Sequence, residues 1–174
     1  QNRKRRRERR DLDSDLHDAC VEGDLNRVRA CLLVMPAVSK WHLKAAVTHS
    51  TPTVVDLLLC HTNKHPHEFL MLALKLGRPD ILRVLLSGSS TISFFYRAFR
   101  AALQGRCPDC MAQILARASV IHIKNRLINE LQDILPAVAQ RATPATNCKL
   151  LCGAAVNELY GCVDTLLAVK TNIN

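Results

Sequence analysis

The 174-residue chain has few aromatic residues and few glycines, four Phe, two Tyr, one Trp and six Gly. Strands are usually rich in aromatic and β-branched residues, so a sequence dominated by Leu, Ala and Val favours helices. The scattered glycines form no phosphate-binding loop. The composition therefore predicts an all-α protein and gives no support to a glycine-rich nucleotide site.

The sequence also lacks long apolar runs and catalytic constellations. No stretch is apolar enough to cross a bilayer, and the Arg-rich start leads into an acidic segment, unlike a signal peptide. No paired carboxylates or nucleophile elbow can be found. We therefore expect a protein that is not an enzyme, without cofactor, metal, small-molecule substrate or membrane association. The chain begins with Gln rather than Met, which suggests a piece of a longer protein.

Positive charge is concentrated at the N-terminus. The net charge is +9, and seven of the first ten residues are basic while one is acidic. The basic side chains of this tail are Arg3, Lys4, Arg5, Arg6, Arg7, Arg9 and Arg10. Such a run predicts a disordered tail over residues 1–12. It can serve as a nuclear import signal, as a phosphate-binding arm, or only as a solubilising end.

Eight cysteines are present, several of them on apolar helical faces in a chain without a secretion signal. Reduced, buried thiols in an intracellular protein are the favoured interpretation. Cys107 and Cys110 have the C-x-x-C spacing of redox and zinc sites. No strand pattern precedes them, and the next candidate ligands, Cys148 and Cys152, lie one or two repeats away. A metal or redox site is therefore the less favoured interpretation.

Prolines recur at a regular spacing along the chain. Pro52, Pro79, Pro108 and Pro136 are separated by 27, 29 and 28 residues, and each precedes an apolar helical segment. Proline is favoured in the first turn of a helix, where its missing N–H would be unpaired anyway. Each proline therefore predicts the start of an equivalent helix in a repeated unit.

A second helix precedes each proline, and one pattern of small and large residues recurs across the pairs. A small residue six positions before the proline, with large residues around it, allows two helices to cross closely. The frame comprises Leu43, Ala46, Val55 and Leu59; Leu70, Ala73, Leu82 and Leu86; and Phe99, Ala102, Met111 and Leu115. It also fits Leu16, Ala19, Val28 and Leu32, and again Leu151, Ala154, Val163 and Leu167. A degenerate unit with Leu127, Pro136 and Ala139 has Glu130 at the small position.

The first unit, LHDACVEGDLNRVRACL, resembles the ankyrin repeat, as do GRPDILRVLLSG and GCVDTLLAVKTNIN. The resemblance covers residues 13–174 and implies an α-solenoid of about six stacked helix-turn-helix repeats. The ankyrin period is about 33 residues, longer than the spacing here, and the Asp-x-x-Gly-x-Thr-Pro opening is absent. We therefore expect short loops in place of β-hairpin fingers. An α-solenoid of another type is the alternative.

The spacing predicts a repeat domain over residues 13–174. Its expected units are 13–38, 39–65, 66–93, 94–121, the degenerate 122–147, and 148–174. The family resemblance also places His17 at the Leu-His position, where we expect it to form hydrogen bonds between neighbouring loops. His61, His65 and His67 are expected to be loop residues rather than metal ligands. Phe95 and Phe99 share a helical face and are expected to fill the core.

Ankyrin-like arrays bind partners through the first helix of each pair, and the same register predicts the exposed face of that helix. Positions seven apart on a helix share a face. The predicted partner-binding residues are Asp18, Glu22, Trp41, Thr48, His49, Glu68, Lys75, Arg97 and Gln104. This face would be acidic at Asp18, aromatic at Trp41 and basic toward Arg97.

These features predict a non-catalytic protein–protein interaction module, an adaptor or scaffold in a larger intracellular protein of the nucleus or cytoplasm. The alternative is a nucleic-acid-associated protein that uses the basic tail and a basic middle. Between Lys75 and Arg126 the chain has nine Lys and Arg, against two acidic residues, Asp80 and Asp109. Binding to phosphates would weaken steeply with salt, which separates the two interpretations.

Overall fold

The structure, a computed structural model, describes residues 2–35, 37–62, 67–87, 95–117, 131–156 and 158–171. These residues form eleven helices and no strand, so the all-α prediction is confirmed for the described part of the chain. The helices are α1 (Asn2–Glu22), α2 (Leu25–Val34), α3 (Lys40–His49), α4 (Pro52–Cys60), α5 (His67–Lys75), α6 (Pro79–Leu86), α7 (Phe95–Gln104), α8 (Pro108–Arg117), α10 (Leu135–Arg141), α11 (Pro144–Val156) and α12 (Tyr160–Thr171). None of these helices is long and apolar enough to span a membrane.

Proline begins the second helix of three pairs, as the spacing predicts. Pro52, Pro79 and Pro108 are the first residues of α4, α6 and α8, where no intrahelical N–H is required. Pro136 is the second residue of α10. The first pair has no proline, and there Asp24 caps α2 instead. Its carboxylate accepts hydrogen bonds from the backbone N–H groups of Asn26 and Arg27, each at 3.0 Å.

A left-handed residue recurs in the turns that join paired helices. Gly23 and Gly77 have φ of 74° and 62°, and Arg106 and Glu158 have φ of 46° and 57°. Each of these four residues lies two positions before the first residue of the next helix. Glycine adopts this conformation at no steric cost, whereas the side chains of Arg and Glu make it unfavourable. The same reversal of the chain is therefore built four times from different residues.

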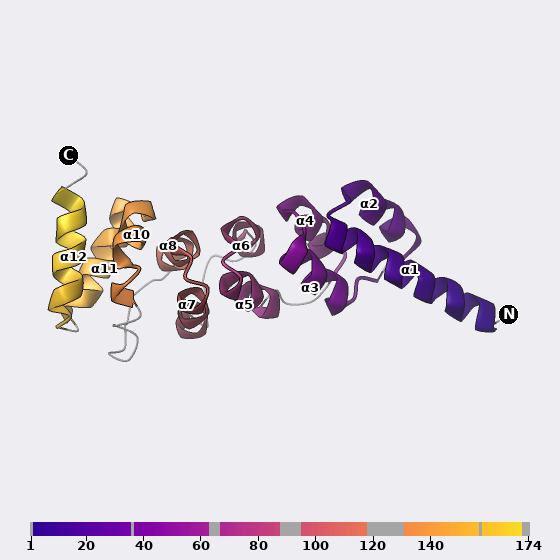
Figure 1. The fold of residues 1–174 in the computed structure, drawn as a ribbon, viewed down its shortest axis with the longest axis horizontal. Coiled ribbons are helices and arrows are strands. Elements are labelled where there is room, and N and C mark those ends of the chain that lie inside the picture. Colours follow the sequence, from indigo (N-terminus) through magenta and orange to yellow (C-terminus); the bar gives the residue numbers. More distant parts are fainter. Residues whose placement is uncertain are drawn as a thin grey trace. The chain divides into compact units, whose positions relative to one another are not determined.

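The described chain divides into two compact units, residues 1–73 and residues 74–174, where the sequence predicts one repeat domain. In the first unit α1 packs against α2, and α3 packs against α4. The first helices also pack together, α1 on α3, and so do the second helices, α2 on α4. Figure 1 shows this arrangement at the indigo and magenta end of the chain.

The second unit contains a continuous series of second helices. α6 packs on α8, α8 on α10, and α10 on α12, while α7 pairs with α8 and α11 with α12. At the junction of α5 and α7, Gly105 permits a close backbone approach. A Cβ atom at Gly105 would lie 2.1 Å from the carbonyl oxygen of Leu74, a distance that no side chain tolerates.

The predicted packing frame is confirmed for the first four pairs, with one exception. The small residues Ala19, Ala46, Ala73 and Ala102 are fully buried, and the large frame residues around them are buried as well. The exception is Leu59, which is half-buried because Leu58 takes the inward position on α4. The alanine of each of these four pairs thus lies in the core, as the frame predicts.

The frame is wrong in the last pair. Ala154 is buried as predicted, but Leu151 and Val163 are half-buried and Leu167 is exposed. Leu150, Cys162 and Leu166 are buried instead, so the inward face is displaced by one position. α11 also begins at Pro144, before the expected unit boundary at 148. In the degenerate unit Ala139 is buried and Pro136 exposed, while Leu127 and Glu130 lie outside the described residues.

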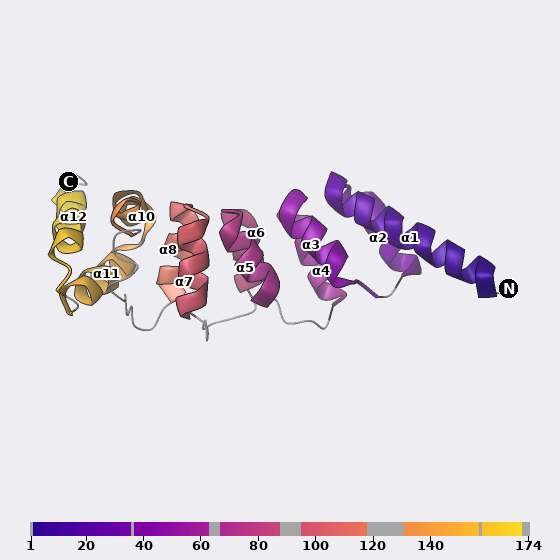
Figure 2. The same cartoon turned by 60° about the horizontal axis from the view of Figure 1, so that its bottom comes forward.

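The N-terminal tail is helical in the structure, whereas the sequence predicts disorder over residues 1–12. α1 begins at Asn2, and the first buried residue among its described side chains, which start at Arg10, is Leu16. Arg, Lys and Glu are good helix formers, and a helix extends at low cost from a packed turn. Figure 2 shows the N-terminal end of α1 extending away from α2, α3 and α4.

Candidate functional site

Trp41 is exposed on the first turn of α3. Its relative exposure is 63%, although it is the only Trp in the chain. The Lys40 and Lys44 ammonium groups lie 6.0 and 5.6 Å from the centroid of its ring, within the range of cation–π attraction. The sequence analysis missed these lysines, although Lys44 follows Trp41 by one helical turn. The surface at Trp41 is therefore both aromatic and basic.

The other predicted residues of α3 differ in exposure. His49, the last residue of the helix, is exposed. Thr48 is half-buried, and its hydroxyl group donates a hydrogen bond to the Lys44 carbonyl oxygen at 2.8 Å. Trp41 is therefore the exposed apolar side chain of this helix, whose other apolar residues are buried.

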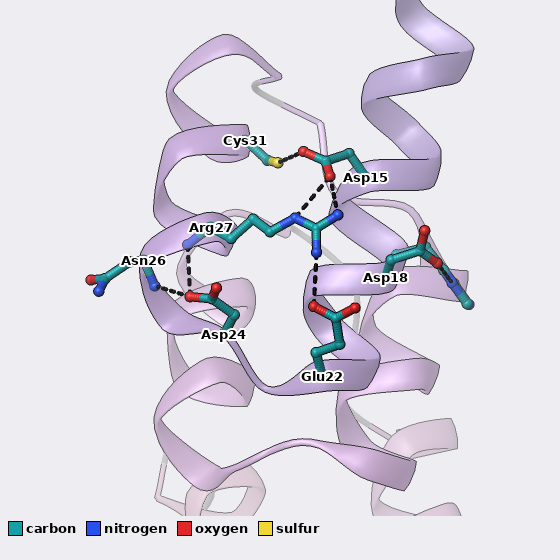
Figure 3. Close-up of polar contacts among 8 residues, drawn as sticks. Asp15, Asp18, Glu22, Asp24, Asn26, Arg27 and Cys31 are labelled. Carbon is teal, nitrogen blue, oxygen red and sulfur yellow. Dashed lines mark hydrogen bonds and ion pairs between the residues drawn. The ribbon is translucent and has the colours of Figure 1, made fainter.

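A polar cluster joins α1 to α2 and includes Glu22. The Arg27 guanidinium donates from Nε to Asp15 Oδ1 at 2.8 Å and from Nη1 to Glu22 Oε2 at 2.7 Å (Figure 3). It also contacts Asp15 through Nη2, and the Cys31 thiol donates to Asp15 Oδ2 at 3.3 Å. Glu22 thus has a structural partner, whereas the exposed Asp18 contacts the neighbouring His17 ring at 3.4 Å.

The cluster fixes the charge states of its members. The hydrogen bond from Arg27 holds the pKa of Asp15 below its usual 3.8, and the same contact raises the pKa of Arg27. Burial, followed by the hydrogen bond to Asp15, raises the pKa of the Cys31 thiol. Cys31 therefore stays protonated and acts as a donor rather than as a nucleophile.

His42 is a buried histidine that the sequence analysis missed. Its side chain is 1% exposed. The Ser39 backbone N–H donates to Nδ1 at 3.2 Å, so the opposite nitrogen, Nε2, carries the proton and donates to the Asp13 carbonyl oxygen at 3.1 Å. His42 thus caps α3 and bridges it to α1. Among the described residues, the His17 ring contacts Asp18 of the same helix, and no hydrogen bond from it to a neighbouring loop is found there.

The predicted residues of the basic half are exposed. Lys75 ends α5, Arg97 lies near the start of α7, and Gln104 ends α7. The Gly105 backbone lies against the carbonyl groups of Leu74 and Lys75, so the C-terminal end of α7 adjoins the C-terminal end of α5. The structure therefore brings Lys75 and Gln104 to the same end of neighbouring helices.

The predicted residues divide between the two units. The acidic and aromatic members lie in residues 1–73, and the basic ones in residues 74–174. Those in the first unit are Asp18, Glu22, Trp41, Thr48, His49 and Glu68, and Glu68 is exposed on α5. Those in the second unit are Lys75, Arg97 and Gln104.

The cysteines are less buried than the sequence predicts. All eight are free thiols, but only Cys20, Cys31, Cys110 and Cys162 are buried. Burial, followed by a hydrogen bond with the half-buried Cys107, raises the pKa of Cys110. The exposed thiols are Cys60, Cys148 and Cys152.

No group of three or more His, Cys, Asp or Glu within the described ranges is arranged to hold a metal ion. His61 and His67 are exposed, and the His61 ring contacts the Leu57 carbonyl oxygen at 2.9 Å. His65 lies outside the described residues. Of the aromatic segment, Phe99 is buried as predicted, while the Phe95 side chain is not described.

In the basic tail, Arg10 is exposed on α1. The side chains of Arg3, Lys4, Arg5, Arg6, Arg7 and Arg9 lie outside the described part of the chain.

Comparison of the chain with models of protein families, with curated proteins and with solved structures finds no significant match. The likeness to the ankyrin repeat therefore rests on the residues quoted above.

Proposed function

We propose that the chain is a non-catalytic protein–protein interaction module, an ankyrin-like α-solenoid that serves as an adaptor or scaffold. It binds a partner protein through its first helices, with Trp41 as the anchor. The observation that carries the proposal is the exposure of this Trp between two lysines. Trp and Arg dominate the binding energy of protein interfaces.

The helical packing supports the proposal. The two helices pack on each other in four pairs, α1 with α2, α3 with α4, α7 with α8 and α11 with α12. Second helices also follow one another in contact through residues 79–171. Stacked helix pairs that contact only their neighbours form extended surfaces suited to macromolecular partners. The recurring left-handed turn residue agrees with one unit repeated along the chain.

The proposal is tested by affinity capture with the full chain and with a form lacking residues 1–10, followed by mass spectrometry. Trp41→Ala and Arg97→Glu should each weaken binding of the captured partner by about 1–3 kcal/mol without changing the melting temperature. Tyr160→Ala and Arg29→Glu, at exposed positions outside the predicted face, are the matched controls. Full binding by both test variants would show that the partner uses another surface.

A second candidate function is binding of nucleic acid by the basic tail and the basic middle. It is supported by the exposure of Lys75, Arg83, Arg97, Arg100 and Arg106. A DNA or RNA complex that neutralises several phosphates loses affinity steeply between 50 and 200 mM salt, by roughly 10³-fold for six contacts. Binding that depends only weakly on salt would exclude this function.

A further inference from the structure

A groove of about 320 Å³ lies along α6, α8 and α10 in the second unit. Its lining includes two small residues of α8, Ala112 and Ala116, and three arginines, Arg83, Arg117 and Arg141. A volume of this size falls in the range of ligand-binding sites, roughly 300–1,000 Å³.

Two of the three arginines are available to a ligand. Arg141 Nε lies 3.2 Å from the Asp109 carboxylate, so these two charges are paired. Arg83 and Arg117 make no hydrogen bond or ion pair to any other residue within the described ranges. The groove therefore presents two positive charges without an acidic partner among the described residues, the guanidinium groups of Arg83 and Arg117. Each is planar and can donate two parallel hydrogen bonds.

Three helices begin beside the groove, but the N-terminus of α8 lies at the Asp109 end, about 12 Å from Arg117. α6 begins at Pro79, which lines the groove, and α8 begins at Pro108, next to Asp109. α11 begins directly after Thr143, another lining residue. The N-terminus of a helix carries a partial positive charge and favours anions.

The groove is longer than a single anion. Asp109 and Arg117 both line it and are eight residues apart on α8, which places them about 12 Å apart along the helix axis. That length corresponds to three or four residues of extended peptide. Midway between them, Gln113 donates from Nε2 to the Pro79 carbonyl oxygen at 3.1 Å, while its Oε1 atom is buried without a hydrogen-bond partner.

We infer that this groove binds a short phosphorylated segment of a partner protein, with the phosphate of a phosphoserine or phosphothreonine held by Arg83 and Arg117. A phosphate monoester carries a charge of about −1.5 to −2 at neutral pH, which matches two free arginines better than one carboxylate does. Arginine binds phosphate through two parallel hydrogen bonds. This inference rests on the proposed function, binding of a protein partner, and adds that the partner carries a phosphate group.

Nucleic acid fits the groove less well. Proteins that track a nucleic-acid backbone present a basic stripe along it. Here the groove holds an acidic residue, Asp109, and its free positive charges are confined to Arg83 and Arg117. The arrangement suits one doubly charged group rather than a row of phosphates.

The test uses the full chain, immobilised, and degenerate nonapeptide libraries with phosphoserine, serine or glutamate fixed at the centre. Retention of the phosphoserine library should exceed that of the serine library by about tenfold or more, and Arg83→Gln or Arg117→Gln should reduce it by about tenfold. Arg117→Lys keeps the positive charge but cannot donate two parallel hydrogen bonds to the phosphate, so it should retain only part of the binding. Arg100→Gln, an exposed arginine on α7 outside the groove, should bind as the parent does.

Five outcomes would overturn the inference. Equal retention of the phosphoserine and serine libraries, or equal effects of Arg117→Gln and Arg100→Gln, would show that the groove is not a phosphate site. Retention of the glutamate library equal to that of phosphoserine would assign it to carboxylates. Competition by inorganic phosphate at the peptide concentration would assign it to free phosphate. A DNA 20-mer that binds more tightly, with the same sensitivity to Arg117→Gln, would assign it to nucleic acid.

The proposed function fails separately. If Trp41→Ala weakens capture of the protein partner while no library is retained, the module binds its partner without the groove. If phosphopeptides are retained but Trp41→Ala and Arg97→Glu leave capture of the partner unchanged, the groove functions and the predicted first-helix face does not.

Discussion

A buried polar residue, His42, connects α3 to α1. Its side chain is almost completely enclosed. Its two ring nitrogens satisfy a backbone N–H at Ser39 and a carbonyl at Asp13. A buried group that loses its partner costs more free energy than the hydrogen bond itself contributed. His42 therefore has a stabilising role that its position on an apolar helix does not suggest.

Replacing His42 with Leu, of similar volume, should lower the free energy of unfolding by about 1–3 kcal/mol, because the Ser39 N–H loses its acceptor inside the protein. Chemical denaturation measures this change. His49→Leu, at the exposed end of the same helix, should change stability by less than about 0.5 kcal/mol. Equal effects of the two substitutions would mean that the bridge to Asp13 contributes nothing.

Asp15 should make stability depend on pH in the acid range. Its pKa is held below 3.8 by Arg27, so the folded state binds a proton less readily than the unfolded state does. The stabilisation is therefore present above about pH 3.8 and is lost as the pH falls through the lower, folded-state pKa.

Asp15→Asn should accordingly be less stable than the parent at neutral pH, and the difference should shrink as the pH falls below 3.8. Denaturation curves at several pH values measure it. The control is Asp18→Asn, since that carboxylate contacts His17 rather than an arginine. A difference between parent and Asp15→Asn that persists at low pH would show that packing, not charge, is responsible.

At the scale of the helix pair, the turn between the two helices contains one position with positive φ, and this backbone conformation favours glycine there. Arg106 has a φ of 46° at the position that Gly77 fills in the preceding pair. A side chain in this region is strained, and glycine relieves the strain although it loses more conformational entropy on folding. The strained arginine in the turn between α7 and α8 should therefore be replaceable with a gain in stability.

Arg106→Gly should raise the free energy of unfolding by about 0.5–1 kcal/mol, and Gly77→Ala should lower it by about 1 kcal/mol or more. Arg106→Ala is the control, because it removes the charge but keeps the Cβ atom and should bring no gain. The measurement is the shift of the denaturation midpoint. A loss of stability in Arg106→Gly would contradict the common turn.

At the scale of the whole molecule, the basic tail is set apart by its charge and its position. Its backbone forms the N-terminal end of α1, which extends away from α2, α3 and α4 (Figure 2). Its dense like charge opposes compact packing. The tail should therefore contribute to localisation or to phosphate binding rather than to the fold.

Deleting residues 1–10 should leave the melting temperature nearly unchanged and remove a small part of the helical circular dichroism. If the tail is an import signal, a fluorescent fusion should also move from the nucleus toward the cytoplasm. A fall in melting temperature of more than about 4 °C, equivalent to about 1 kcal/mol or more for a chain of this size, would show that the tail stabilises the fold.

Three features could be predicted from the sequence alone: the helical class, the starts of three second helices at Pro52, Pro79 and Pro108, and the burial of one alanine in each of the first four pairs. These features follow from local rules: proline fixes its own φ and lacks an N–H, and only a small side chain permits close crossing. In the last pair no such rule shows whether Leu150 or Leu151 is the buried residue. The prediction placed Leu151 in the core, but Leu150 is buried there.

Only the tertiary structure decided which residues distant in the sequence meet. His42 reaches Asp13, Arg27 reaches Asp15, and the groove gathers Arg83, Arg117 and Arg141 from three helices. Periodicity identifies the buried face of one helix but not the distance and register at which another helix packs on it. Those depend on the fit of all the side chains at the crossing, so the partners of polar residues emerge only when the helices are assembled.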